Sequence, residues 1–178
     1  MDISGIMLNL LVGIVGGIFS SIIVSRIFLI STEFKEQIHR VQERVENTFY
    51  LSGLLDVVLA FYKDGSEPND AIKEKIIEIT DSESISYRQM IFDDLEEDLH
   101  ALATDYNDFI VNISVSVYVI NESIVIESIK RLNNLIDKFS IYKKSYKKIL
   151  RRLLLKDKML RILFIFLVII IILTIFTM

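Results

Sequence analysis

The chain has 178 residues, of which 52% are hydrophobic and 25% are charged, with a net charge of −4 and no cysteine. This apolar content excludes an ordinary soluble domain, and the charge content excludes a protein that lies wholly inside a membrane. The two kinds of residue must therefore be segregated along the chain. The lack of cysteine excludes disulfides, zinc clusters and thiol chemistry.

The first predicted element is an apolar helix near the N-terminus. No charged side chain occurs in the 23 residues from Ile3 to Ser25, enough for a helix rising about 1.5 Å per residue to cross a hydrocarbon core of about 30 Å. A cleaved signal peptide is the alternative, but it would have basic residues before its apolar core and small residues after it. Here Asp2 precedes the run and Arg26 follows it. We therefore expect a retained transmembrane helix over residues 4–30.

A small-residue stripe follows one side of this helix, with Gly16 and Ser20 beside it. Its members recur every four residues and are Asn9, Gly13, Gly17, Ser21 and Ser25. Small residues in this register let two helices approach closely in lipid. The stripe could pack on a second span of the same chain or on other copies, and the pattern leaves both open. In an assembly, its polar members would line a pore with Arg26 at the cytoplasmic mouth.

The same helix is expected to continue to Tyr62, because apolar residues keep a three-four spacing beyond the membrane. Its predicted buried side consists of Ile38, Val41, Val45, Phe49, Leu55 and Leu59, with Ser52 in the same series. Turn residues in 63–69, including the only proline, end the helix. A short helix follows, capped by Asn69 or Asp70 and broken by residues 81–84. Its predicted buried residues are Ile72, Ile76 and Ile79.

A third helix is predicted from Ser86. Its apolar side is expected to carry Tyr87, Ile91, Leu95, Leu99, Leu102 and Tyr106. The acids of 93–98 with His100 could indicate a metal site, but carboxylates so close on a helix cannot all converge on one ion, so we expect a solvated acidic surface. Residues 111–119 alternate apolar and polar side chains, which is typical of a strand. A helix is favoured because no other segment offers a strand partner, and the sequence alone leaves both open.

A seven-residue repeat then predicts a long helix that packs along another and leads into a second span. The repeat is Val125, Leu132, Phe139, Tyr146 and Leu153, with Ile129, Ile136 and Leu150 as companions. From Ile162 to Met178 no residue is charged, which predicts a second transmembrane helix over residues 159–178. The expected fold class is an all-α membrane protein with two terminal transmembrane helices continuous with a cytoplasmic antiparallel helical bundle over residues 31–158.

Basic residues crowd against the second span and indicate its orientation. This basic flank contains one acid, Asp157, and nine bases, namely Lys143, Lys144, Lys147, Lys148, Arg151, Arg152, Lys156, Lys158 and Arg161. Such flanks stay in the cytoplasm, so we expect a bacterial plasma (inner) membrane protein with a cytoplasmic body and both termini outside. The flank is expected to contact anionic lipid headgroups, or only to be solvated while it sets the topology.

Residues 64–108 have the opposite charge. They hold fourteen acids and three bases, a net charge of −11, and we expect them to lie away from the bilayer, where they could recruit a cytoplasmic protein partner. No direct nucleic-acid binding and no cofactor are expected. The sequence has no GxSxG, no HExxH and no phosphate-binding glycine loop, so we expect no enzyme.

The overall layout and the stripe from Asn9 to Ser25 resemble the small membrane effectors of bacterial antiphage systems, such as the accessory membrane proteins of RNA-targeting (type VI) CRISPR systems. The chain departs from them in its second, terminal span and in having no arginine shortly before His39 or His100. The resemblance implies an oligomeric pore or membrane-disrupting effector in antiviral defence, triggered from the cytoplasm. Two other functions stay open, namely a membrane-tethered adaptor with an acidic bundle and a holin-like or toxin-like membrane protein.

Overall fold

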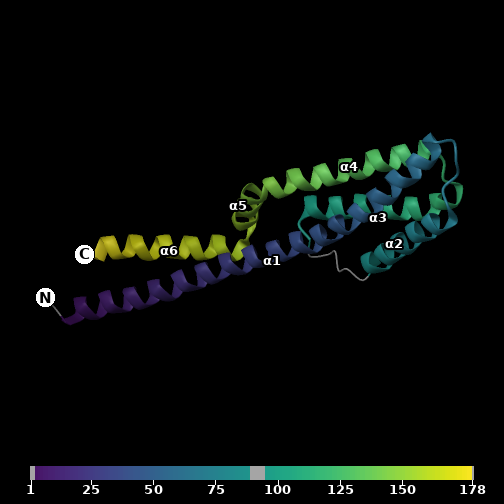
Figure 1. The fold of residues 1–178 in the computed structure, drawn as a ribbon. Coiled ribbons are helices and arrows are strands. Elements are labelled where there is room, and N and C mark those ends of the chain that lie inside the picture. Colours follow the sequence, from purple (N-terminus) through teal and green to yellow (C-terminus); the bar gives the residue numbers. More distant parts are fainter. Residues whose placement is uncertain (1–2, 89–94, 178) are drawn as a thin grey trace. The chain divides into compact units, whose positions relative to one another are not determined.

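The protein is all-helical over the residues that its computed structural model describes, which are 3–88 and 95–177, except for the side chains at 3–6, 8, 9, 84–88, 118, 173, 176 and 177. Within these residues there is no strand (Figure 1). The helices are α1 (Ile3–Lys63), α2 (Asp70–Arg88), α3 (Glu97–Ser116), the 3-10 turn η1 (Val117–Val119), α4 (Glu122–Lys144), α5 (Tyr146–Lys156) and α6 (Lys158–Thr177).

The helices group by their contacts into two compact units, each described by itself below. We call residues 1–35 with 145–178 the terminal unit, and residues 36–144 the body unit. Helix α1 contributes residues to both units. Residues 31–35 and 145–158, which the sequence assigned to the bundle, thus group with the terminal segments.

Helix α1 ends where the turn residues predicted. The amide of Ser66 donates to the carbonyl oxygen of Phe61 at 3.0 Å and the amide of Gly65 donates to that of Tyr62 at 3.0 Å. Gly65 has φ = +73°, a conformation that glycine adopts without a steric penalty. This pair of bonds is a Schellman motif, which satisfies the last carbonyl groups of the helix.

One side of α1 is buried in the body unit. Four residues predicted for this side are buried, namely Ile38, Val41, Val45 and Leu55. Phe49 is 56% exposed, and the buried Thr48 takes its place, with its hydroxyl donating to the carbonyl oxygen of Val45. The prediction for Phe49 is wrong because the buried side advances by three residues from Val45, which turns Phe49 away by about 100°.

Helix α2 begins at the predicted cap. The side-chain oxygen of Asn69 accepts from the amide of Ala71 at 2.8 Å. Of the predicted buried residues, Ile76 is fully buried, while Ile72 and Ile79 are half-buried.

The predicted break at residues 81–84 is wrong, because α2 continues to Arg88. The polar groups that would break a helix find partners instead. The hydroxyl of Thr80 donates back to the carbonyl oxygen of Ile76 at 2.9 Å. Ser114 donates to the Asp81 carboxylate at 3.1 Å, and Asn47 to the Glu83 carboxylate at 3.3 Å.

Helix α3 starts at Glu97 rather than at Ser86, which belongs to α2. The buried Glu96 carboxylate caps it by accepting from the amides of Asp98 at 3.1 Å and Leu99 at 3.3 Å. The hydroxyl of Tyr142 on α4 donates to the same carboxylate at 2.9 Å. Several predicted residues lie outside the described side chains, namely Tyr87, Ile91, Asp93 and Asp94.

The helical interpretation of residues 111–119 is confirmed, since α3 and η1 cover them. Ile113 and Val117 are buried, whereas Val111, Val115 and Val119 are exposed. Both sets recur every four residues, which is the spacing of one helical face.

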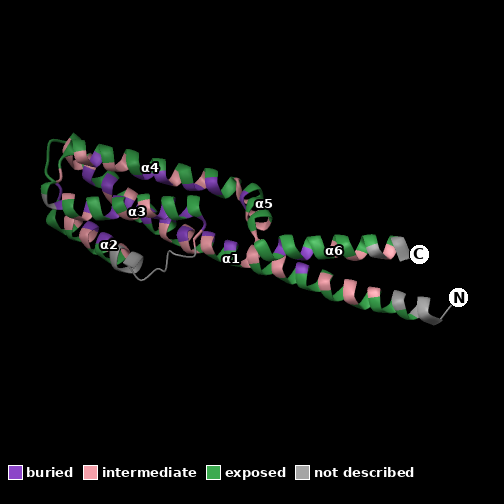
Figure 2. Cartoon of the chain, turned by 180° about the vertical axis from the view of Figure 1, so that it is seen from behind, coloured by how far each residue is buried: buried purple, intermediate pink, exposed green. Residues whose placement is uncertain are grey.

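Helix α4 packs on α3 through a seam slightly rotated from the predicted one. The buried residues are Val125, Leu132, Leu135, Phe139 and Tyr142, while the expected companions Ile129 and Ile136 are only half-buried. Figure 2 shows buried positions along α1, α3 and α4 of the body unit.

The predicted continuous helix into the second span is wrong. Helix α4 stops at Lys144, and α5 and α6 are separate helices, with Asp157 extended between them (φ −66°, ψ 116°). Asp157 caps α6, because its carboxylate accepts from the amide of Leu160 at 2.8 Å. This cap gives the chain a local alternative to one uninterrupted helix.

Candidate membrane unit and its open face

One helix among the described residues, Leu10–Lys63, has the length and apolar composition needed to cross a membrane. Helix α6 is apolar on all sides. From Ile162 onward, nine of its described large apolar side chains are at least 45% exposed: Ile162, Phe164, Ile165, Phe166, Val168, Ile169, Ile171, Ile172 and Ile175.

Helices α1 and α6 of the terminal unit meet along a seam of large apolar side chains, to which α5 adds Leu154. Ile23 of α1 is buried with Leu160 and Leu163 of α6. Phe19 of α1 and Phe166 of α6 place their ring centroids 6.0 Å apart. The half-buried residues that complete the seam are Ile27, Ile30, Leu154 and Leu167. On α1 these residues recur every three or four positions, so α6 covers one side of α1.

An ion pair lies on the same side of α1. The Nη2 atom of Arg26 is 2.8 Å from Oδ2 of Asp157, whose side chain is only 14% exposed. The hydrogen bond from Arg26, together with that from the Leu160 amide, holds the pKa of Asp157 below its ordinary value. Arg26, which was predicted to lie at the mouth of a pore, instead forms an ion pair with Asp157, the single acid of the basic flank. Its position three residues after Ile23 could have indicated this.

A second contact attaches the start of α5 to α1. The ring of Tyr146 stacks on the buried ring of Phe34, with centroids 5.2 Å apart and planes 13° apart. The Tyr146 hydroxyl lies 3.4 Å from the Ser31 hydroxyl. Helix α5 is therefore attached to α1 through its first residue and through Asp157, the residue after its last.

The small-residue stripe stays uncovered. Gly13, Gly17, Ser21 and Ser25 are exposed, and the side chain of Asn9 lies outside those described. A Cβ atom added at Gly13, Gly16 or Gly17 would meet no neighbouring atom within 4 Å. Among the described side chains, α6 therefore does not pack on the stripe, although a second span of the same chain was one of the two partners that the sequence left open.

The bases of the flank are distributed over three helices. All nine are exposed, with Lys143 and Lys144 ending α4 and Lys158 and Arg161 opening α6. The remaining five belong to α5 and are Lys147, Lys148, Arg151, Arg152 and Lys156. These bases flank the uncharged run of α6, and no sequence pattern indicated that α5 is a separate helix.

The acidic region of the body unit is also largely exposed. Ten of its acids have exposed side chains, namely Asp64, Glu67, Asp70, Glu74, Glu78, Asp81, Glu97, Asp98, Asp105 and Asp108. Asp105 forms a 2.9 Å ion pair with Lys138. Across the described part of the chain, no group of three or more acidic or histidine side chains is arranged to hold a metal ion.

No family model matches the chain, and neither a curated protein nor a solved structure does. Its function must therefore be inferred from its own residues.

Proposed function

We propose that this chain is a bacterial inner-membrane protein that assembles into a homo-oligomer through the open side of α1 and makes the membrane permeable. One observation carries the proposal. The helix side suited to close packing in lipid, with Gly13, Gly16 and Gly17, is uncovered, while α6 occupies a different side of the same helix.

Placement in lipid is supported by the exposed surface of α6. A helix that is apolar on all sides belongs in a protein core or in a membrane. Burying a large apolar side chain is worth about 1.5–3 kcal/mol, so each half-exposed one forgoes roughly 1 kcal/mol in water. Nine such side chains forgo about 10 kcal/mol, as much as the total stability of a typical domain, about 5–15 kcal/mol. A hydrocarbon surrounding removes this penalty.

Self-association is supported by the spacing of the glycines. Lipid supplies no hydrophobic drive between helices, so association depends on close van der Waals contact between backbones. Gly13 and Gly17 are four residues apart, the spacing of a helix-dimerisation motif. A second copy of α1 is a suitable partner because it presents the same stripe.

A further uncovered surface of α1 lies in the body unit. Phe49, Tyr50 and Val57 are 56%, 60% and 44% exposed, and a Cβ atom at Gly53 would meet nothing within 4 Å. Positions 49, 53 and 57 share one helix face. Contiguous apolar surface of this kind marks interaction sites in proteins, and contact between copies would cover it.

Permeability would follow if the polar members of the stripe faced a central lumen in the assembly. The basic flank favours a cytoplasmic body with both termini outside, so that a trigger would act on the acidic body. We further propose antiviral defence by membrane disruption as the biological role. This role is supported by the resemblance of the overall layout and of the small-residue stripe to antiphage membrane effectors.

The exposed acids of the body favour a second function, a membrane-tethered adaptor that recruits a basic cytoplasmic protein. The two functions differ in what expression does to a cell. We expect induced expression to collapse the membrane potential and admit an otherwise excluded dye, and Gly17→Leu to abolish both effects. An intact potential at full expression of the inserted protein would reject the pore and leave the adaptor.

A further inference from the structure

We infer that α5 is a headgroup-binding helix whose exposed basic side holds anionic phospholipids by charge, without inserting its apolar side into the bilayer. The inference rests on the membrane placement given under the proposed function. It deepens that function by naming a lipid partner and the surface that binds it.

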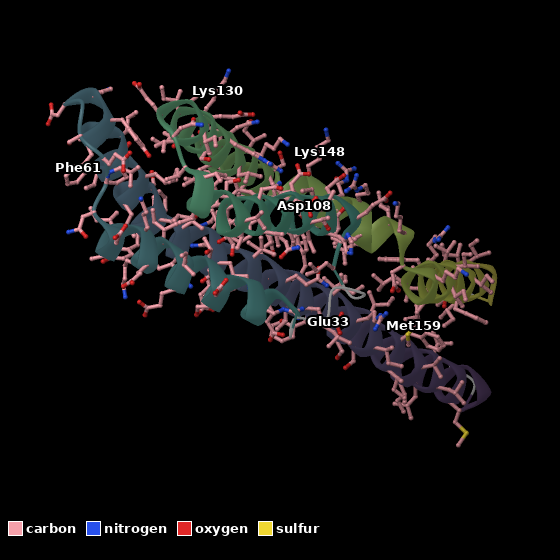
Figure 3. All side chains as sticks on the ribbon, turned by 90° about the vertical axis from the view of Figure 1, so that its right-hand side faces the viewer. Glu33, Phe61, Asp108, Lys130, Lys148 and Met159 are labelled. Atoms are coloured by element: carbon pink, nitrogen blue, oxygen red, sulfur yellow. The ribbon has the colours of Figure 1, made fainter. Side chains whose placement is uncertain are left out.

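Helix α5 has two distinct sides. At 100° per residue, its bases occupy one half of the helix circumference and its apolar residues occupy most of the other half. The apolar side carries Tyr146, Ile149, Leu150, Leu153 and Leu154, and the bases are Lys147, Lys148, Arg151, Arg152 and Lys156; the remaining apolar residue, Leu155, lies among the bases. Figure 3 labels Lys148 among the exposed side chains.

The apolar side of α5 is already in use within the chain. Ile149 is buried, Leu154 packs on the cluster of Ile23, Leu160 and Leu163, and the ring of Tyr146 stacks on Phe34. A membrane-surface helix normally binds by burying its apolar side among the acyl chains. Helix α5 cannot do so while these contacts hold, so its binding must depend on charge and must weaken with salt.

The two attachments also hold the basic side in place. Tyr146 at the start and Asp157 just after the end fix α5 against α1. A flexible basic tail would lose conformational freedom on binding, whereas a preorganised surface loses less. Helix α5 contains no acid, and the neighbouring Asp157 is paired with Arg26, so no carboxylate of this segment competes with a lipid phosphate.

The position of α5 identifies the anion as a lipid headgroup. Only residues 157–161 separate it from the uncharged run of α6, and the helical ones, Lys158–Arg161, rise by about 6 Å. The headgroup layer of one leaflet is about 5–7 Å thick. Leu155, which is 65% exposed between Lys148 and Arg151 on the basic side, would meet the boundary between headgroups and acyl chains.

The test uses the full-length protein in vesicles of phosphatidylcholine with increasing phosphatidylglycerol. Because the chain has no cysteine, Leu155→Cys can carry a single environment-sensitive fluorophore. We expect its emission to rise with phosphatidylglycerol and to fall again at high salt. Each lost cation should weaken the affinity for phosphatidylglycerol vesicles roughly fivefold. The triple variant with Lys147→Gln, Lys148→Gln and Arg151→Gln should therefore bind them about a hundredfold more weakly.

The matched control removes three positive charges from the body unit, with Lys63→Gln, Lys73→Gln and Lys130→Gln, and should respond like the parent. A response that is equal in pure phosphatidylcholine, independent of salt, or unchanged in the α5 triple variant would overturn the inference. So would a response to added single-stranded nucleic acid but not to phosphatidylglycerol. If the protein inserts normally into phosphatidylcholine and shows no lipid response, only this inference fails. If it does not insert at all, the proposed function fails with it.

Discussion

Replacement of Gly17 by leucine tests the assembly through α1, because the structure predicts that it leaves the stability of a single chain unchanged or slightly higher but weakens the association between copies. In one copy a side chain at Gly17 meets nothing within 4 Å. Glycine inside a helix is about 0.5–1 kcal/mol less favourable than alanine, so Gly17→Ala and Gly17→Leu should leave the single chain as stable as before, or slightly more stable. In an assembly the added side chain would occupy the space of a neighbouring backbone.

The expected loss follows from the cost of overpacking, about 1–3 kcal/mol per contact. Since 1.4 kcal/mol is a factor of ten, association should weaken by about 5- to 150-fold per interface. Mass photometry in detergent over a concentration series measures this loss, and circular dichroism on heating checks the single chain. The matched control is Ile18→Phe, which adds bulk at a position 55% exposed and about 100° around the helix. The reasoning is refuted if Gly17→Leu assembles like the parent, or if Ile18→Phe dissociates as strongly.

Three further predictions concern the body and the topology. Leu132→Ala removes a fully buried side chain and should lower the free energy of unfolding by about 2–5 kcal/mol. Ile126→Ala on the same helix, where the side chain is 49% exposed, should lower it far less. Equal losses in denaturant titrations would contradict the assigned seam of α4. Burial raises the pKa of Glu83, so the ionised carboxylate destabilises the folded protein once the pH exceeds the ordinary pKa of a glutamate. Glu83→Gln should therefore raise the Tm at neutral pH but not below that ordinary pKa. A rise in Tm that persists at the lower pH would argue against burial of the charge as the cause. In cells, a membrane-impermeant maleimide should label Asp2→Cys without lysis and Lys148→Cys only after lysis, and the reverse pattern would invert the topology.

The sequence predicted those features that depend on local chemistry. The turn at Gly65 and the cap at Asn69 follow from short-range rules, and the structure has both. Residues 111–119 are helical against their local strand-like alternation, and the sequence favoured the helix only because no other segment offered a strand partner. The end of α1 was placed within one residue because glycine, proline and polar side chains leave few alternatives to a turn.

The errors arose where contacts between distant segments decide the outcome. Residues 81–84 stay helical because Ser114 and Asn47 bind their carboxylates, and no local pattern contains those partners. Thr48 and Phe49 are adjacent in the sequence, so a shift of the buried side of α1 by one position decides which of the two is buried.

The terminal unit shows the same division between local and distant effects. Its apolar runs and the basic flank are readable directly from composition, and so is the small-residue stripe. The pairing of Arg26 with Asp157 and the stacking of Phe34 on Tyr146 join residues more than a hundred positions apart. These pairings lie at the two ends of α5, and the seven-residue repeat carried no signal of them because it runs through Tyr146 unbroken.

The most direct test of the central claim is whether the two apolar ends require lipid. We expect the full-length protein to sediment with membranes, to resist extraction by alkaline carbonate, and to enter solution only with detergent. A full-length protein that is monodisperse in plain buffer without detergent would show that these ends are covered by protein, and would contradict both the membrane placement and the assembly through α1.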